Sequence, residues 1–170
     1  MAGLFEEEKI GSLPVISLPE QSGLYQTYFW RHQQTIERSV LNRLVQRYQP
    51  ALVHVHVVYG FAREAMYLKQ VKGIPFIVSE HMGPFPFEWL HDKEAVVMQP
   101  IKAASAVGAV STAQAKQIDA YTGVKAVVVP NVVDEVSFRF EESELNAPAE
   151  NSFQLVFVGI YAKAKGVDYL

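Results

Sequence analysis

The sequence has no cysteine among its 170 residues, which excludes disulfides, thiolate nucleophiles and zinc sites built on cysteine. It also has no apolar run approaching the roughly 20 residues that a transmembrane helix needs. The first residues, Met1 to Lys9, are acidic and show neither the basic start nor the apolar stretch of a secretion signal. We therefore expect a cytoplasmic protein.

An excess of positive charge is missing as well. The net charge is −3 and the isoelectric point is about 5.9, so the chain lacks the positive field with which proteins neutralise nucleic-acid phosphates. We expect no nucleic-acid partner. Hydrophobic residues make up 49% of the chain, which is enough to bury the core of one domain together with part of another.

The strands are predicted from short apolar runs that are continuous and do not alternate with polar residues. Such runs are typical of parallel sheets whose strands are buried on both faces. Helical stretches separate most neighbouring runs, so we expect right-handed crossovers. The runs are Leu52–Val58, Pro75–Val78, Ala106–Val110, Ala126–Val129 and Phe153–Val158.

The helical stretches are recognised by apolar residues at helical spacing, by caps and by terminating glycines. Their alternation with the apolar runs predicts an α/β fold, a Rossmann-like parallel sheet with flanking helices. The stretches are Tyr25 to Tyr48; 61–71, which ends near Gly73; 93–104, which Pro100 interrupts; and Ser111 to Tyr121, which Gly123 closes.

The composition changes between Asn131 and Asn151, where acidic residues and proline replace the apolar runs. Such a stretch is typical of a solvated linker. We therefore divide the chain into a partial Rossmann-like domain over 1–135, an acidic linker over 136–151, and the start of a second Rossmann-like domain over 152–170. The last apolar run would be the first strand of that second domain.

His81 is the sharpest candidate for chemistry. It follows a predicted strand and precedes Gly83 and Pro84, which shape a turn, and ligands of open α/β sheets bind at the carboxyl ends of strands. A neutral imidazole there could donate a hydrogen bond to a sugar hydroxyl or a phosphate. The alternative is a structural histidine bonded to a backbone carbonyl. Glu80 beside it lines the same cleft and either orients His81 or is solvated.

His54 and His56 lie two residues apart on one predicted strand, so they share a face of the sheet. This spacing suits a pair of metal ligands, but no cysteine or clustered carboxylate supplies the others, and we expect no metal site. His56 lies nearer the end of the strand and is a candidate to line the cleft. His54 is better explained as a core histidine.

Five further candidate positions follow predicted strands. Lys165 and Gly166 come after the last run and Gly159, where a helix amino terminus and a lysine charge would suit a diphosphate, although an exposed lysine near a helix start is common. Ser111 caps a helix, and it could also line the cleft. Asn131 either bonds across the cleft to a second domain or makes a turn.

The predicted helix from Tyr25 to Tyr48 carries four arginines against one glutamate, Glu37. A basic amphipathic helix can lie on anionic lipid, so peripheral contact with the inner face of a membrane is one interpretation. In the more common arrangement the aromatic stripe packs on the sheet and the arginines face water.

Five segments, in this order and spacing, make the chain resemble glycosyltransferase family 4, whose members are retaining sugar transferases with the GT-B fold. The resemblance covers residues 50–170. The segments are Pro50–His56, Gly73–His81, Ala106–Ser111, Val129–Asp134 and Phe157–Gly159, with Lys165-Gly166-Val167 downstream.

The resemblance implies two Rossmann-like domains, the first binding a glycan or lipid-linked acceptor and the second binding a nucleotide-diphosphate sugar. It implies that His81 contacts the transferred sugar, that Lys165 contacts the donor phosphates, and that Asn131 leads into the interdomain linker. The implied activity is hexosyl transfer with retention, as in polysaccharide biosynthesis, without a bound metal or other cofactor.

The chain departs from the family pattern in three places. Ile160 stands where the family usually has an arginine for the diphosphate. Nothing before Pro50 matches the first strand and its glycine-rich loop, and Ile10 to Leu18 resembles a later strand. The paired glutamates of the family belong beyond Leu170. We therefore expect this chain to be inactive alone. The alternatives are another GT-B enzyme, such as a nucleotide-sugar epimerase, and a non-catalytic remnant or binding domain.

Overall fold

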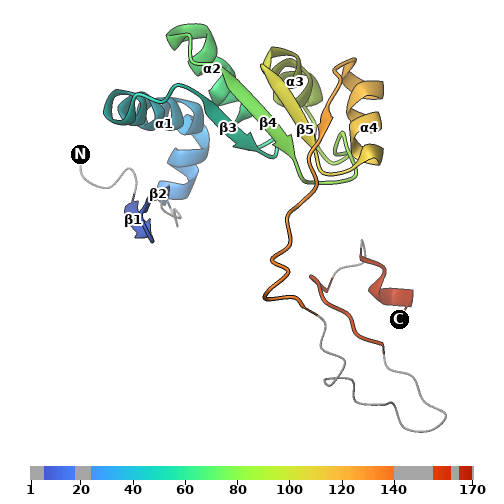
Figure 1. Ribbon diagram of the computed structural model, residues 1–170. Helices are drawn as coiled ribbons and strands as arrows, with labels where there is room; N and C mark the ends of the chain where they lie inside the picture. Colours follow the sequence, from blue (N-terminus) through green and yellow to red (C-terminus); the bar gives the residue numbers. More distant parts are fainter. Residues whose placement is uncertain (1–5, 18–23, 140–154, 162–164, 170) are drawn as a thin grey trace, which may run out of the picture. The chain divides into compact units, whose positions relative to one another are not determined.

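A computed structural model describes residues 6–17, 24–139, 155–161 and 165–169 of the chain (Figure 1). Contacts between Cα atoms divide the chain into two compact units, Met1–Asn131 and Val132–Leu170. Each unit is described by itself. The domain boundaries expected at 135 and 151 stay predictions, because residues 140–154, which hold most of the acidic linker, lie outside the described residues.

The first unit is built on a four-stranded parallel sheet, as the continuous apolar runs predicted. Neighbouring strands pair in the order β3-β4-β5-β6, with Val55 opposite Val78 and Val78 opposite Val107. Parallel pairing requires a crossover between successive strands, and helices supply it. The strands are β3 (Val53–His56), β4 (Phe76–Glu80), β5 (Ala106–Ala109) and β6 (Val127–Val128).

Three helices begin and end close to their predicted positions. They are α1 (Leu24–Tyr48), α2 (Ala62–Lys72) and α4 (Thr112–Thr122). Gly73 and Gly123 end α2 and α4 in the left-handed region, with φ of 69° and 75°, where glycine has no Cβ to clash. The alternation of strands and helices confirms the predicted α/β fold. No helix in the described part of the chain is long and apolar enough to cross a bilayer.

The helix predicted over 93–104 changes type just before Pro100, which lies in the first turn of its second part. A π-helical turn, η1 (Glu94–Met98), leads into the short helix α3 (Gln99–Ala103), and the backbone N–H of Gln99 bonds to the carbonyl of Glu94. Proline has no N–H, and its ring crowds the carbonyl four residues earlier. The wider π turn accommodates the proline without breaking the chain direction.

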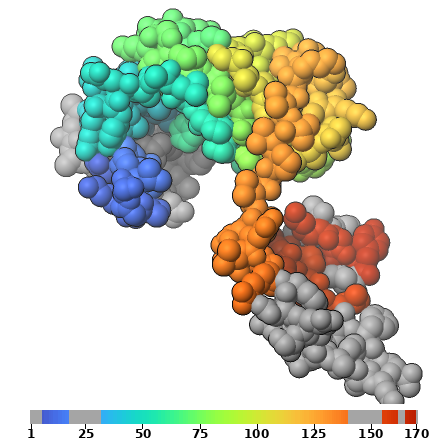
Figure 2. Space-filling view, viewed as in Figure 1, coloured from blue at the N-terminus to red at the C-terminus, as the bar shows by residue number. Residues whose placement is uncertain are grey.

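A two-stranded antiparallel hairpin precedes α1. It consists of β1 (Glu6–Ile10) and β2 (Leu13–Ser17), and Gly11 takes a φ of 63° in the turn. The expected strand over 10–18 is therefore half right, because β2 lies within it but Ile10 belongs to β1. Arg47, near the end of α1, holds the hairpin through two hydrogen bonds to the carboxylate of Glu7, at 2.7 and 3.0 Å. In Figure 2 the hairpin, in dark blue, lies against the cyan part of the first unit.

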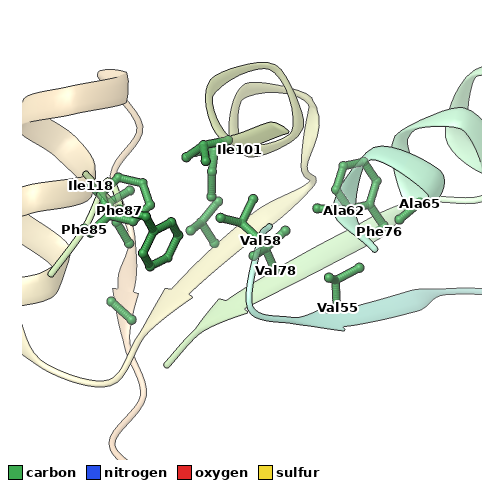
Figure 3. Close-up of a cluster of buried hydrophobic side chains, with 13 residues drawn as sticks. Val55, Val58, Ala62, Ala65, Phe76, Val78, Phe85, Phe87, Ile101 and Ile118 are labelled. Carbon is green, nitrogen blue, oxygen red and sulfur yellow. The ribbon is translucent and has the colours of Figure 1, made fainter. Parts of the chain in front are cut away.

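The hydrophobic core lies between the sheet and the helices that follow its strands. Figure 3 shows its side chains, which come from β3, β4 and β5, from the loops after β3 and β4, and from α2, η1, α3 and α4. Helices α2, α3 and α4 lie on the same side of the sheet in Figure 1. The core cluster includes Val55, Ala62, Phe76, Val78, Phe87, Ile101, Val107 and Ile118.

The expectation that the strands are buried on both faces is wrong for the described residues. Burial alternates along β4, where Phe76 and Val78 are buried while Ile77 and Ser79 are only half-buried. On β3, Val55 is buried and His54 and His56 are exposed. A continuous apolar run shows that both faces tolerate apolar residues, but it does not show that a layer covers each face.

The strand expected over 153–158 is not present in its described part. Residues 155–158 form no ladder and are exposed, and the unit's only assigned element in its described residues is one 3-10 turn, η4 (Val167–Tyr169). A strand is stabilised by hydrogen bonds to a neighbouring strand. Among the described residues of this unit no such neighbour exists.

Candidate functional site

Three polar side chains meet at the carboxyl edge of the parallel sheet. His56 is the last residue of β3, His81 follows the last residue of β4, and Asn131 lies shortly after β6. His56 Nδ1 lies 2.9 Å from His81 Nε2, and His81 Nδ1 lies 3.0 Å from Asn131 Oδ1. The three side chains are exposed. We call these three residues the edge triad; all three were candidates from the sequence.

The partners of the edge triad fix where the ring protons lie. An amide oxygen can only accept, so His81 Nδ1 carries a hydrogen and donates it to Asn131. In a neutral ring His81 Nε2 then accepts, and His56 Nδ1 must donate to it. His56 Nε2 is left as the accepting nitrogen without a protein partner in the described part of the chain. His81 can therefore donate to a ligand only after one of its partners moves away.

This arrangement predicts an uncommon tautomer at both rings, with the proton on Nδ1. We expect nitrogen–proton long-range NMR spectra of the neutral rings to show His56 and His81 in this form. The substitution Asn131→Ala removes the acceptor, and His81 should shift toward the Nε2–H form. Ser79→Ala is the matched control, because it should alter only His54. An unmodified chain with His81 protonated on Nε2 would contradict the assignment.

His54 extends the row of rings along the exposed face of the sheet. Its Nε2 lies 2.8 Å from Ser79 Oγ, and its ring centroid lies 4.2 Å from that of His56. Burial lowers the pKa of His54, and the nearby charges that His56 and His81 can carry lower it further. His54 therefore stays neutral in neutral solution. No group of three or more ligating side chains in the described residues is placed to hold a metal ion.

Glu80 holds the loop that follows His56 and the loop that begins at His81. Its side chain is fully buried, so it does not line an open cleft as expected from the sequence. Its carboxylate accepts hydrogen bonds from the backbone N–H groups of Val58 at 3.0 Å, His81 at 2.9 Å and Met82 at 2.8 Å. Of the two interpretations offered for Glu80, the orienting one matches this geometry. A buried carboxylate needs such donors to offset its lost hydration.

Val57 connects His56 to the residue that Glu80 binds, and its backbone is strained. Its φ is 67°, in the left-handed region that β-branched residues rarely occupy. Its N–H still donates to the carbonyl of Ser79 at 2.9 Å. This turn ends the strand directly after His56 and brings Val58 to the carboxylate of Glu80.

Gln114 is a positioning residue that the sequence analysis missed. It is buried, its Oε1 accepts from the N–H of Val110 at 3.0 Å, and its Nε2 donates to the carbonyl of Met82 at 2.8 Å. Ser111 caps α4 by accepting from the N–H of Gln114 at 3.2 Å, which matches its predicted capping role. The signal was the spacing from Ser111 to Gln114, typical of a capping box.

The expected donor-side residues lie in the second unit. Gly159 and Lys165 are exposed, and Gly166 has a φ of 72° just before η4. Lys165 therefore precedes a single 3-10 turn in place of the expected helix, and residues 162–164 lie outside the described residues. Their contact with donor phosphates stays a prediction.

The family described as Glycosyltransferase Family 4 matches residues 5–136, which is most of the chain and includes the edge triad, Glu80 and Gln114. No curated protein matches.

Proposed function

Because this chain belongs to glycosyltransferase family 4, we propose that it serves retaining transfer of a hexosyl group from a nucleotide-diphosphate sugar to a glycan or lipid-linked acceptor. The observation that carries the proposal is the edge triad. It places two imidazoles and an amide at the carboxyl edge of a parallel sheet, where α/β folds bind ligands. These groups offer the mixed donors and acceptors that sugar hydroxyls require.

In this proposal the first unit binds the acceptor and holds His81 against the transferred sugar. His56 Nε2 accepts from a hydroxyl, and Glu80 keeps both rings in place through the backbone of their loops. Departure of the diphosphate from the anomeric carbon needs positive charge, which Lys165 would supply. The nucleotide sugar is the substrate, and the proposal includes no resident metal or cofactor.

We further propose that the 170-residue chain alone is inactive. Gly159 and Lys165 are exposed on segments that have no strand ladder among the described residues, so a bound diphosphate would be met largely by water. Ile160 adds no donor where the family usually has an arginine. Electrostatic stabilisation of a leaving group is strong only where water is excluded.

The test has two parts, a titration and a transfer assay. In the first, methyl glycosides and oligosaccharides are added to the purified chain while the ring signals of His56 and His81 are followed by NMR. Saturable shifts are expected. In the second, the chain is incubated with nucleotide sugars and the same acceptors, and no product is expected from the chain alone.

The outcomes separate the alternatives. A new nucleotide sugar formed without an acceptor would favour an epimerase. If no sugar shifts the NMR signals of His56 and His81, the result would favour a binding domain unrelated to sugars and would count against the proposal. Product formed by the purified chain would refute its inactivity alone.

Peripheral contact with the inner face of a membrane remains a separate proposal. Two arginines of α1 already have protein contacts, since Arg47 binds Glu7 and the guanidinium of Arg38 lies 4.5 Å from the centroid of the Tyr67 ring. These contacts leave less of the positive charge of α1 for anionic lipid. Flotation of the chain with anionic vesicles tests it.

A further inference from the structure

Three aromatic rings form a cluster in the loops after β3 and β4. The centroid of Tyr59 lies 5.8 Å from that of Phe87 and 5.2 Å from that of Trp89, and Phe87 lies 6.0 Å from Trp89. Tyr59 meets both other rings edge-on, at 72° and 85°. Phe87 is 1% exposed, whereas Tyr59 is 39% and Trp89 is 58% exposed. Phe87 is therefore buried, whereas the two rings that it contacts, Tyr59 and Trp89, are exposed to solvent.

The cluster lies at the same edge of the sheet as the edge triad. Tyr59 comes three residues after His56, and Trp89 belongs to the loop that begins at His81. Both loops leave the carboxyl ends of neighbouring parallel strands. Aromatic faces and hydrogen-bonding side chains are thus presented at one end of the first unit.

The backbone beneath the cluster is held in a strained conformation. Phe87 has a φ of 67°, as does Val57 in the other loop. Each such residue costs on the order of 1–3 kcal/mol, and such strain persists only where surrounding contacts impose it. Here Phe87 donates to the carbonyl of Pro84 at 3.1 Å and accepts from the N–H of Leu90 at 3.0 Å, and its ring meets that of Phe85 at 70°. A rigid, strained support for two exposed aromatic rings points to a ligand.

We propose that Tyr59 and Trp89 form a stacking subsite for a pyranose ring of the acceptor. The subsite rests on the function proposed above and identifies where the acceptor sugar lies. The C–H bonds on one face of a pyranose carry partial positive charge and pack against the negative face of an aromatic ring. The hydroxyls around its rim remain free to bond to the edge triad. The rings of Tyr59 and Trp89 are nearly perpendicular, so one ring can stack on a face of the sugar while the other limits the orientation of the sugar.

The surroundings favour a sugar over a hydrocarbon chain. A hydrocarbon lying along this edge would bury His56 Nε2, which has no protein partner in the described part of the chain, and burying an unpaired polar atom is costly. A sugar satisfies both kinds of surface, because its faces are apolar and its rim is polar. A lipid-linked acceptor would accordingly place its sugar here, and its hydrocarbon tail elsewhere.

The experiment follows the indole N–H signal of Trp89 in the unmodified chain during titration with methyl glucoside, methyl galactoside, methyl mannoside and their disaccharides. The signal is assigned by its loss in Trp89→Phe. We expect one or more glycosides to shift it saturably. We expect Trp89→Ala to weaken that sugar's binding about tenfold, and Trp89→Phe to retain most of it, because phenylalanine keeps an aromatic face.

The matched control is Tyr48→Ala. Tyr48 is likewise an exposed aromatic residue, but it lies at the end of α1 that leads into the amino end of β3, opposite the edge triad. Its substitution should leave sugar affinity unchanged. Because both side chains are exposed, we expect each variant to keep its fold, and circular dichroism checks this.

The outcomes distinguish this subsite from the function on which it rests. The subsite is overturned if sugars shift the histidine signals but not the indole signal of Trp89, or if they bind Trp89→Ala as tightly as the unmodified chain. Either result leaves the proposed function standing. Sugars that move neither set of signals overturn both. A shift of Trp89 by hexanol but not by any glycoside would show a hydrocarbon site and overturn the subsite.

Discussion

Glu80→Ala is expected to lower the free energy of unfolding of the first unit by about 3–5 kcal/mol. The substitution leaves the N–H groups of Val58, His81 and Met82 without the carboxylate that accepts from them. Each buried donor left unpaired costs about 1–3 kcal/mol, and removal of one buried charge offsets part of the sum. Because domains of this size are stable by about 5–15 kcal/mol, the loss is large. Urea denaturation followed by circular dichroism measures it.

Two variants separate the acceptor role of Glu80 from its charge. Glu80→Gln keeps one accepting oxygen, so its loss of stability should be roughly half that of Glu80→Ala. Glu88→Ala removes an exposed carboxylate from the loop after the same strand, and it should change stability by less than about 0.5 kcal/mol. Equal effects of Glu80→Ala and Glu88→Ala would show that the three hydrogen bonds do not hold the loops.

Phe76→Ala is expected to lower the free energy of unfolding by about 3–5 kcal/mol, the range for large core aromatics. Phe76 is 0% exposed and belongs to the core cluster between the sheet and the helices. Its neighbour Ile77 points to the opposite, half-buried face of β4. For Ile77→Ala we expect a loss below about 2 kcal/mol, since part of that side chain is already in water.

Comparing the stability losses of Phe76→Ala and Ile77→Ala tests whether only one face of the sheet is covered. The two residues share one strand, so effects on strand propensity are similar and the difference reports what lies against each side chain. A loss at Ile77 as large as that at Phe76 would mean that a second layer packs on the other face, and would contradict the one-sided core. Both values come from the same denaturation measurement.

Much of the fold was predictable from the sequence because its signals are local. Gly73 and Gly123 mark helix ends through the backbone freedom of glycine, and Ser111 marks a helix start through its side-chain oxygen. Runs such as that ending at Val78 predicted the strands and their parallel pairing, although not that only one face of the sheet is buried. These features depend on a few neighbouring residues, and a sequence displays them directly.

What the sequence did not show depends on partners distant along the chain. The burial of Glu80 and its bond to the N–H of Val58 join residues that are 22 positions apart. The bond between His56 and His81 spans 25 positions and decides which nitrogen carries a proton. A strand's period predicts that His54 and His56 share a face, but not that this face stays exposed. The last apolar run predicted a strand, yet strand formation also requires a neighbour.

Because of where Glu80 lies, one residue affects both the amount of this protein in a cell and the geometry of the edge triad. The same carboxylate that maintains the fold also fixes the loop after His56 and the loop that begins at His81. A substitution there should therefore first increase degradation of the protein by the cell's quality-control proteases, before any folded protein with an altered edge can accumulate. Natural variation at this residue would be filtered by protein quality control, whereas variation at the exposed Trp89 should largely escape that filter.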